Sequence, residues 1–250
     1  MSAIIVIEGT DGTGKATQSQ ALHQRLTANG FSTQIISFPR YDGPFGPEIK
    51  RYLKRQLDLD AFAAAQLYAA DRLDALDQIK QAINNNDFVI FDRYVSSNLA
   101  HQGARVIDQS ERQALYKKII KLEYHHNRLA QPDHTVILSL PEEQIQTLIR
   151  NRNPNGDLDK HEADSNYLIR TASCYDELQK LGFLGNTSKI NCAPNNQMLT
   201  VEIISQLIYD QINYLIKSYS ATNWKTRSSR QSTSPRSSYW RWTWSLCARL

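Results

Sequence analysis

The segment Gly9–Thr17, which reads Gly-Thr-Asp-Gly-Thr-Gly-Lys-Ala-Thr, constrains this chain more than any other feature. It follows the apolar run Ala3–Ile7 and precedes a stretch whose apolar residues have helical spacing. Glycines let backbone N–H groups curl around an anion, the start of a helix adds the positive end of its dipole, and Lys15 adds a full charge. The order of strand, glycine-rich turn and helix therefore predicts a loop that binds nucleotide phosphates.

The residue after the lysine departs from the usual form of this loop. The pattern has a Ser or Thr there, whose hydroxyl binds Mg²⁺, whereas this chain has Ala16. The next hydroxyl, that of Thr17, points about 100° away around the helix axis, so it is no simple replacement. If Mg²⁺ is used, we expect other residues to supply part of its binding.

The remainder of the chain up to about residue 218 alternates between short apolar runs and stretches with helical spacing. Alternation of this kind predicts an α/β fold with a parallel sheet covered on both faces, that is, a three-layer P-loop fold with five strands. Strands are expected at residues 3–7, 33–38, 87–92, 134–140 and 188–192. Helices are expected at residues 18–29, 48–56, 61–83, 109–129, 142–151 and 162–181, with a last one ending near 218.

The last 31 residues differ in composition, and we expect one P-loop domain over residues 1–219 and a tail over 220–250. All four Trp and six of the 29 Lys and Arg follow residue 219, but none of the 25 Asp and Glu does. The body therefore has 23 basic against 25 acidic residues, and the net charge of +4 does not indicate that it binds nucleic acid. We favour a disordered or artefactual tail over an aromatic, basic arm for nucleic acid or an anionic surface.

Cysteine usage and hydropathy favour a cytoplasmic protein. Cys174, Cys192 and Cys247 fit no metal-binding or redox spacing and are expected to be reduced thiols. The N-terminal apolar run has five residues before Glu8, which is too short for a signal peptide, and no apolar run approaches membrane-spanning length. No membrane partner is expected.

Two arginines follow the ends of expected strands, where ligands bind in parallel α/β sheets. Phosphoryl transfer depends mainly on positioning and charge neutralisation, so Arg40 and Arg93 are candidates for holding phosphates. Asp92, at the end of the third strand, is either an Mg²⁺ ligand through water or a helix N-cap.

The sequence resembles the thymidylate kinases, a family of P-loop nucleoside monophosphate kinases. The matching segments are Glu8–Lys15, Phe38–Tyr41, Asp71-Arg72, Asp92–Asn98, Gln102-Gly103 and Asp159–Leu168. They occur in the family's order and spacing over roughly residues 3–218. The resemblance implies transfer of the ATP γ-phosphoryl group to dTMP, with Mg²⁺, in dTTP synthesis, by a homodimer in which the helix at 109–129 takes part.

The resemblance also implies roles for individual residues. Arg40 and Arg93 clamp the acceptor phosphate, Arg72 and Asn98 bond the thymine edge, and His101 replaces the family's frequent tyrosine near the sugar. The catalytic set implied is Lys15, Asp11, Arg93, Arg40 and Arg152. The ATP-binding set is Gly9, Thr10, Asp11, Gly12, Thr13, Gly14, Lys15, Ala16, Thr17 and Arg150. The dTMP-binding set is Asp11, Phe38, Arg40, Tyr41, Tyr68, Arg72, Arg93, Ser97, Asn98, His101, Gln102 and Tyr167.

The polar stretch at about residues 151–161 corresponds to the family's mobile lid, with Arg150, Arg152 and Lys160 as its cations. Mg²⁺ is expected at Asp11, Asp92 and Glu162, in part through water. Two alternatives stay open: a kinase of another deoxynucleoside monophosphate on the same fold, and a non-catalytic nucleotide-binding protein, for which Ala16 and the tail are the reasons.

Overall fold

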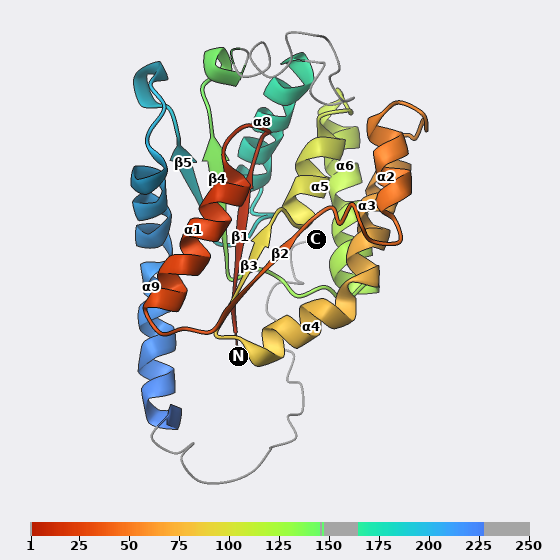
Figure 1. Cartoon of the computed structure of the whole chain (residues 1–250). Helices are drawn as coiled ribbons and strands as arrows, with labels where there is room; N and C mark the ends of the chain where they lie inside the picture. Colours follow the sequence, from red (N-terminus) through yellow and green to blue (C-terminus); the bar gives the residue numbers. More distant parts are fainter. Residues whose placement is uncertain (1, 146, 148–164, 228–250) are drawn as a thin grey trace.

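The computed structural model describes residues 2–145, 147 and 165–227 of the 250. Its core is one sheet of five parallel strands in the order β2-β3-β1-β4-β5 (Figure 1). The strands are β1 (Ala3–Gly9), β2 (Thr33–Ser37), β3 (Phe88–Asp92), β4 (His134–Ser139) and β5 (Thr187–Asn191). All five expected strands are present, with ends that differ from the expected ones by at most two residues.

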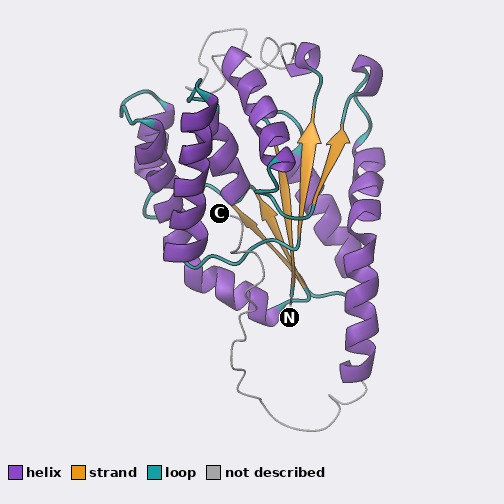
Figure 2. Ribbon diagram, turned by 180° about the vertical axis from the view of Figure 1, so that it is seen from behind, coloured by secondary structure: helices purple, strands orange, loops and turns teal. Residues whose placement is uncertain are grey.

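Helices cover both faces of the sheet, which confirms the three-layer arrangement (Figures 1 and 2). All seven residues of β1 are buried, as is usual for a central parallel strand whose two faces both pack against helices. On one face lie α1 (Lys15–Ala28) and α9 (Val201–Arg227), and on the other α5 (Val95–Gly103) and α8 (Ser165–Lys180). The remaining named helices of the described chain are α2 (Gly46–Leu53), α3 (Ala61–Asp74), α4 (Leu76–Asn85), α6 (Gln109–Ile120), the π-helical turn η1 (Lys121–His126) and the short 3₁₀ turn η2 (Pro194–Asn196).

The expected single helix at 61–83 is wrong. Ala75, with φ −81° and ψ 0°, ends α3 and starts α4 in a new direction. Ile79 and Ala82 of α4 are then buried beside β3, so tertiary packing sets the break, and no Gly or Pro marks it in the sequence.

Helix α5 has no counterpart among the sequence-based expectations. It directly follows β3 through Arg93 and Tyr94, and eight of its nine residues are buried. Its buried residues include Ser96, Ser97 and Asn98 as well as apolar ones, so its sequence lacks the separate apolar and polar faces that make helical periodicity visible. The expected helix at 109–129 is present as α6 but continues as the π-helical η1 and ends at His126.

The last helix is longer than expected and extends past the expected boundary at residue 219. We expected its end near Ser218 and a tail from 220, but α9 continues to Arg227. The aromatic ring of Tyr219 packs against Phe88 and Phe31, and its hydroxyl donates to Asp87 Oδ1 at 2.9 Å. The expected lid at about 151–161 and the tail beyond 227 lie outside the described residues. Among those described, no helix has both the length and the apolar character needed to cross a membrane.

Candidate functional site

The turn between β1 and α1 has the geometry of a phosphate-binding loop. Gly9 has φ +143°, and a Cβ there would lie 2.3 Å from the carbonyl oxygen of Leu138, so only glycine fits. Gly14 has φ +81° and leads into α1 without a side-chain cap. The first N–H groups of α1 are therefore free to face an anion.

Lys15 crosses this loop. Its Nζ donates to the carbonyl oxygen of Thr10 at 2.8 Å, and the Thr13 hydroxyl donates to the same oxygen at 2.9 Å. Burial, followed by the charge of Arg93, lowers the Lys15 pKa to about 8, although Asp11 and other carboxylates oppose the shift. Binding a phosphate here adds negative charge and restores the preference of Lys15 for its protonated form.

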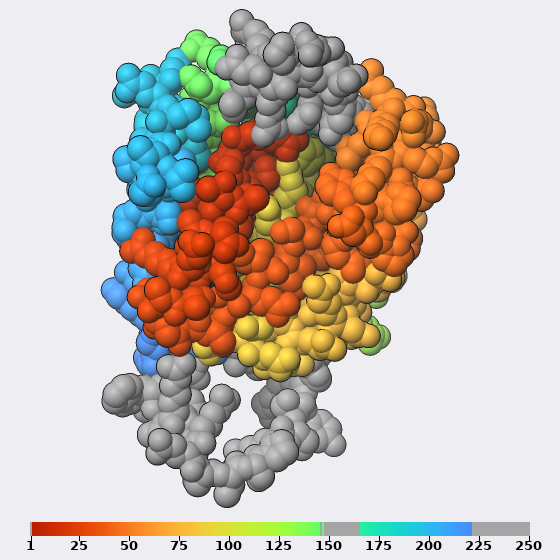
Figure 3. All heavy atoms as spheres, in the orientation of Figure 1, coloured from red at the N-terminus to blue at the C-terminus, as the bar shows by residue number. Residues whose placement is uncertain are grey.

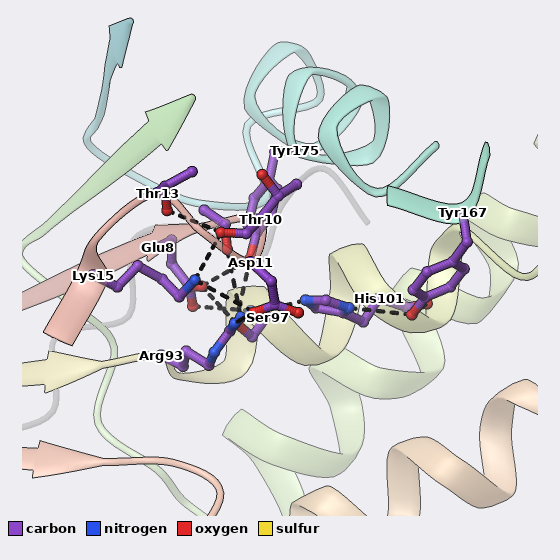
Figure 4. A network of polar contacts seen from close by, with 11 residues as sticks. Glu8, Thr10, Asp11, Thr13, Lys15, Arg93, Ser97, His101, Tyr167 and Tyr175 are labelled. Atoms are coloured by element: carbon purple, nitrogen blue, oxygen red, sulfur yellow. Dashed lines mark hydrogen bonds and ion pairs between the residues drawn. The ribbon is translucent and has the colours of Figure 1, made fainter. Parts of the chain in front are cut away.

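Arg93 faces this loop from the end of β3. Its Nη2 forms a close ion pair with Asp11, and its Nη1 donates to the carbonyl oxygen of Gly9 at 3.4 Å (Figure 4). Burial opposes a charge on Arg93, but Asp11 and other nearby acids outweigh it and raise the pKa, so the guanidinium stays cationic. Asp11 also lies 3.7 Å from Lys15 Nζ, and so sits between the two cations.

A cavity of about 200 Å³ opens beside Asp11 and Arg93. In the space-filling view the surface is hollowed between the red segment that contains the loop and α1 and the orange segment that contains α2 and α3 (Figure 3). Ten of the twelve residues expected to bind the acceptor nucleotide line it, and Pro39, Leu53 and Tyr94 line it in addition. Those ten are Asp11, Phe38, Tyr41, Tyr68, Arg72, Arg93, Ser97, Asn98, His101 and Gln102.

Two residues of the cavity lining, Asn98 and Arg72, both bond to one buried carboxylate, that of Glu123. Asn98 Nδ2 donates to the carbonyl oxygen of Ala65 at 3.0 Å and to Glu123 Oε1 at 2.8 Å, while Asn98 Oδ1 is buried without a partner. Arg72 donates to the same Glu123 through Nε and Nη2. Burial opposes the charge of Arg72, but Glu123 offsets it and raises the pKa. Glu123 thus fixes both groups.

Sequence reasoning did not identify Glu123. It lies in the π-helical turn η1 and is fully buried, whereas the expected regular helix gave no reason to turn it inward. A signal was present all the same: a buried arginine such as Arg72 needs a carboxylate partner, and the acids of nearby helices were the candidates.

Arg40 does not line the cavity, although it was expected to clamp a phosphate there. Its backbone N–H and Nε donate to the buried carboxylate of Asp71 at 2.8 and 3.0 Å. Its Nη2 donates to the Asp71 carbonyl oxygen at 2.7 Å and to Asp74 at 2.6 Å. In this state the guanidinium is held by α3, next to the cavity.

Tyr167, the other expected residue outside the cavity wall, acts behind His101 (Figure 4). The Tyr167 hydroxyl donates to the His101 carbonyl oxygen at 2.9 Å and lies 3.1 Å from His101 Nδ1. The single hydroxyl proton of Tyr167 is donated to the carbonyl oxygen. His101 Nδ1 therefore carries a proton and donates it to the Tyr167 hydroxyl oxygen. Nε2 is then the acceptor for Arg93 Nη1 at 3.4 Å.

Two carboxylates of the site suit a divalent cation. Burial raises the pKa of Asp92, while Lys15 and Arg93 oppose the shift. Asp11 and Asp92 offer oxygen ligands of the kind Mg²⁺ takes together with water and phosphate oxygens, so the residues fit this ion. Within the described ranges, no group of three or more His, Cys, Asp or Glu side chains is arranged to hold a metal by itself. The expected Arg150, Arg152 and Glu162 lie outside those ranges.

Comparison with known proteins identifies the family. The sequence model of the family described as thymidylate kinase matches residues 7–198. This chain belongs to the thymidylate kinase family. It is 32% identical over 189 residues to the thymidylate kinase of Mycobacterium tuberculosis, covering 73% of this chain and 88% of that protein. It is 32% identical over 210 residues to a probable thymidylate kinase of Methanosphaera stadtmanae, covering 82% and 96%.

The structural comparison agrees. The solved structure of thymidylate kinase from Candida albicans matches with a TM-score of 0.68 and 25% identity, covering 87% of this chain and 93% of that one. As a member of the thymidylate kinase family, the chain is a phosphotransferase that phosphorylates dTMP to dTDP with ATP as donor.

Proposed function

We propose that dTMP binds in the cavity with its thymine ring at the Arg72–Asn98 end and its phosphate at Arg93. The observation that carries this is the buried, unpartnered Oδ1 of Asn98 beside the Arg72 guanidinium. Thymine N3–H donates to Asn98 Oδ1, and Arg72 donates to thymine O4. Tyr68 and Phe38, which line the cavity, contact the faces of the ring.

This arrangement favours thymine over the other bases. Cytosine has an unprotonated N3, which would place a lone pair against Asn98 Oδ1 and leave that oxygen unsatisfied, at a cost of about 1–3 kcal/mol. Uracil keeps the N3–H and lacks only the methyl group, a difference worth about 1–3 kcal/mol in an apolar pocket. We therefore propose dUMP as a minor substrate and dCMP as a poorer one.

On the donor side, the amides of residues 9–17 and Lys15 bind the ATP phosphates. Asp11 is then positioned between donor and acceptor, and the acceptor phosphate competes with it for Arg93. Arg40 contributes a second cation once the nucleotide competes with Asp74 for its guanidinium. His101, kept in place by Tyr167, faces the sugar.

Asp11 and Asp92 hold Mg²⁺ in this proposal, in part through water, since Ala16 offers no hydroxyl. The ion supplies neutralisation of the negative charge on the phosphate oxygens. Arg150, Arg152 and Glu162, with the lid at about 151–161, complete the site in our proposal on the strength of the family resemblance.

We also propose a cytoplasmic homodimer. The support for the location is the two described cysteines, Cys174 and Cys192, which are buried free thiols. The support for the dimer is the family resemblance, with α6 as a contributor. Sedimentation equilibrium at micromolar concentration tests the dimer, and a monomeric mass would refute it.

The test of the function is ADP release from Mg²⁺·ATP with dTMP, dUMP, dCMP, dGMP and AMP offered separately. We expect turnover in the order dTMP, dUMP, dCMP, with little for the purines. Equal rates with dTMP and dUMP would refute the proposed base pocket. Binding of dTMP and ATP without ADP release would favour a non-catalytic protein, and Lys15→Ala, which keeps the dTMP cavity, is the matched inactive control.

A further inference from the structure

Glu8, the residue just before the phosphate-binding loop, is fully buried and accepts five hydrogen bonds. Its Oε1 accepts from the backbone N–H groups of Tyr94 and Ser97, both at 2.9 Å, and from the Ser96 hydroxyl at 2.7 Å. Its Oε2 accepts from the hydroxyls of Ser97 at 2.6 Å and Tyr175 at 2.8 Å (Figure 4). A carboxylate buried this completely needs hydrogen-bond donors that hold fixed positions around it.

The network joins three elements that are far apart in sequence. Glu8 belongs to β1, Tyr94 to Ser97 form the start of α5, and Tyr175 belongs to α8. Helix α5 has no side-chain cap of its own at Tyr94. The carboxylate of Glu8 replaces that cap from another element and places a negative charge at the positive end of the helix dipole.

The same network holds Arg93, the cation that we propose binds the acceptor phosphate. Ser97 donates its hydroxyl proton to Glu8, so its oxygen is free to accept from Arg93 Nη1 at 3.3 Å. The Arg93 backbone N–H donates to the carbonyl oxygen of Ile7 at 3.1 Å. Hydrogen bonds therefore tie both the backbone and the guanidinium of Arg93 to β1. Gly9, the first residue of the donor loop, directly follows Glu8 in that strand.

Tyr175 connects α8 to this arrangement. Burial, followed by the charge of Glu8, raises the Tyr175 pKa well above its usual value, so its hydroxyl remains a proton donor at any working pH. Its oxygen also lies 3.2 Å from Ser97 Oγ. Neither Glu8 nor Tyr175 lines the cavity, so they do not contact the acceptor there.

We propose that Glu8 and Tyr175 are positioning residues for phosphoryl transfer, which hold the donor loop and Arg93 in register so that donor and acceptor phosphates align. The proposal rests on the function proposed above. Misplacement of reacting groups by about 1 Å lowers a rate about a hundredfold, whereas binding of each nucleotide by itself does not depend on the alignment of the two phosphates. Loss of the network should therefore lower kcat and leave the two dissociation constants nearly unchanged.

Tyr175→Phe tests this with a matched control. The Tyr116 hydroxyl donates to Glu177 of the same helix α8 at 3.1 Å, and Tyr116 is as buried as Tyr175, but this hydrogen bond lies outside the network of Glu8. We expect Tyr175→Phe to lower kcat about tenfold with KM for dTMP and ATP within about twofold, and Tyr116→Phe to keep kcat within about twofold. Both should lose similar thermal stability.

Equal kcat in the two Tyr→Phe variants would overturn the proposal, as would a rise of KM with kcat unchanged. Glu8→Gln, which turns one acceptor into a donor, should lower kcat about a hundredfold where it folds. If the Glu8→Gln variant does not fold, the Tyr175→Phe result decides the question. A wild-type chain without dTMP turnover would refute the proposed function itself, a result distinct from an active wild type with an unaffected Tyr175→Phe variant.

Discussion

Lys15 is the residue whose charge state the structure constrains most clearly. Burial lowers its pKa to about 8 before nucleotide binds, and ATP phosphates prefer the protonated form. We therefore expect kcat/KM for ATP, which reports the free enzyme, to fall as pH rises above about 8, with a slope approaching tenfold per pH unit. Lys15→Arg is the control, because an arginine stays cationic. A fall of the same size in that variant would assign the titration to another group.

The same pKa shift has a consequence for stability, with a definite sign. The folded-state pKa of Lys15, about 8, is below the ordinary value of 10.5, so the unfolded chain binds more protons between these pH values. The contribution of Lys15 to the free energy of unfolding therefore rises with pH across that window. A comparison of wild type with Lys15→Met by urea unfolding at pH 7.5 and 9.5 measures it. The wild type should gain stability relative to the variant at the higher pH.

Glu123 is the single residue on which the base pocket depends most. Glu123→Gln leaves the Arg72 guanidinium buried without its counter-charge, and breaking such a pair costs about 3–5 kcal/mol. It also weakens the hydrogen bond from Asn98 Nδ2 to residue 123, although the one to the Ala65 carbonyl oxygen remains, so we expect KM for dTMP to rise at least about tenfold. Urea unfolding and steady-state kinetics measure the two effects. Glu48→Gln, which breaks the exposed pair with Arg51, should cost less than about 1 kcal/mol.

At the scale of elements, the contact between α5 and α6 leaves no room for a methyl group. A Cβ on Gly103 would lie 2.5 Å from the ring of Tyr116, which is fully buried. Gly103→Ala should therefore destabilise the fold by about 1–3 kcal/mol and displace the neighbouring Gln102 in the cavity wall. A double-mutant cycle with Tyr116→Leu checks the cause. Additive effects of the two changes would show that the clash with Tyr116 is not responsible.

The elements also show what the sequence could and could not predict. The five strands and the loop at residues 9–17 were predictable because apolar runs and glycines act locally. Of the ten expected residues that line the cavity, eight belong to segments that match the family, and Tyr68 and His101 lie outside them. The break at Ala75, the buried helix α5 and the inward turn of Glu123 depend on contacts between distant segments, and no local pattern marks them. Arg40 lies next to the cavity, and its ion pairs with Asp71 and Asp74 join segments that are distant in sequence, so no local pattern marks them.

For the whole molecule, the question is where the folded chain needs to end. The described chain reaches Arg227, and Tyr219 ties α9 to the opposite end of the sheet from the nucleotide site. Its ring centroid lies 5.3 Å from that of Phe88 and 6.4 Å from that of Phe31. A chain of residues 1–227 should keep the kcat, KM and melting temperature of the full chain.

A chain of residues 1–218 loses this aromatic contact and the hydrogen bond from Tyr219 to Asp87. The loss should cost about 2–3 kcal/mol, since Tyr219 is only half buried, and lower the melting temperature by about 5–10 °C. Its kcat at 20 °C should stay near that of the longer chains, because Tyr219 lies far from Lys15 and Arg93 along β1 and β3. Salt-sensitive binding of DNA by the full chain that is absent from residues 1–227 would instead assign the tail a role of its own, since only phosphate contacts lose affinity steeply with salt.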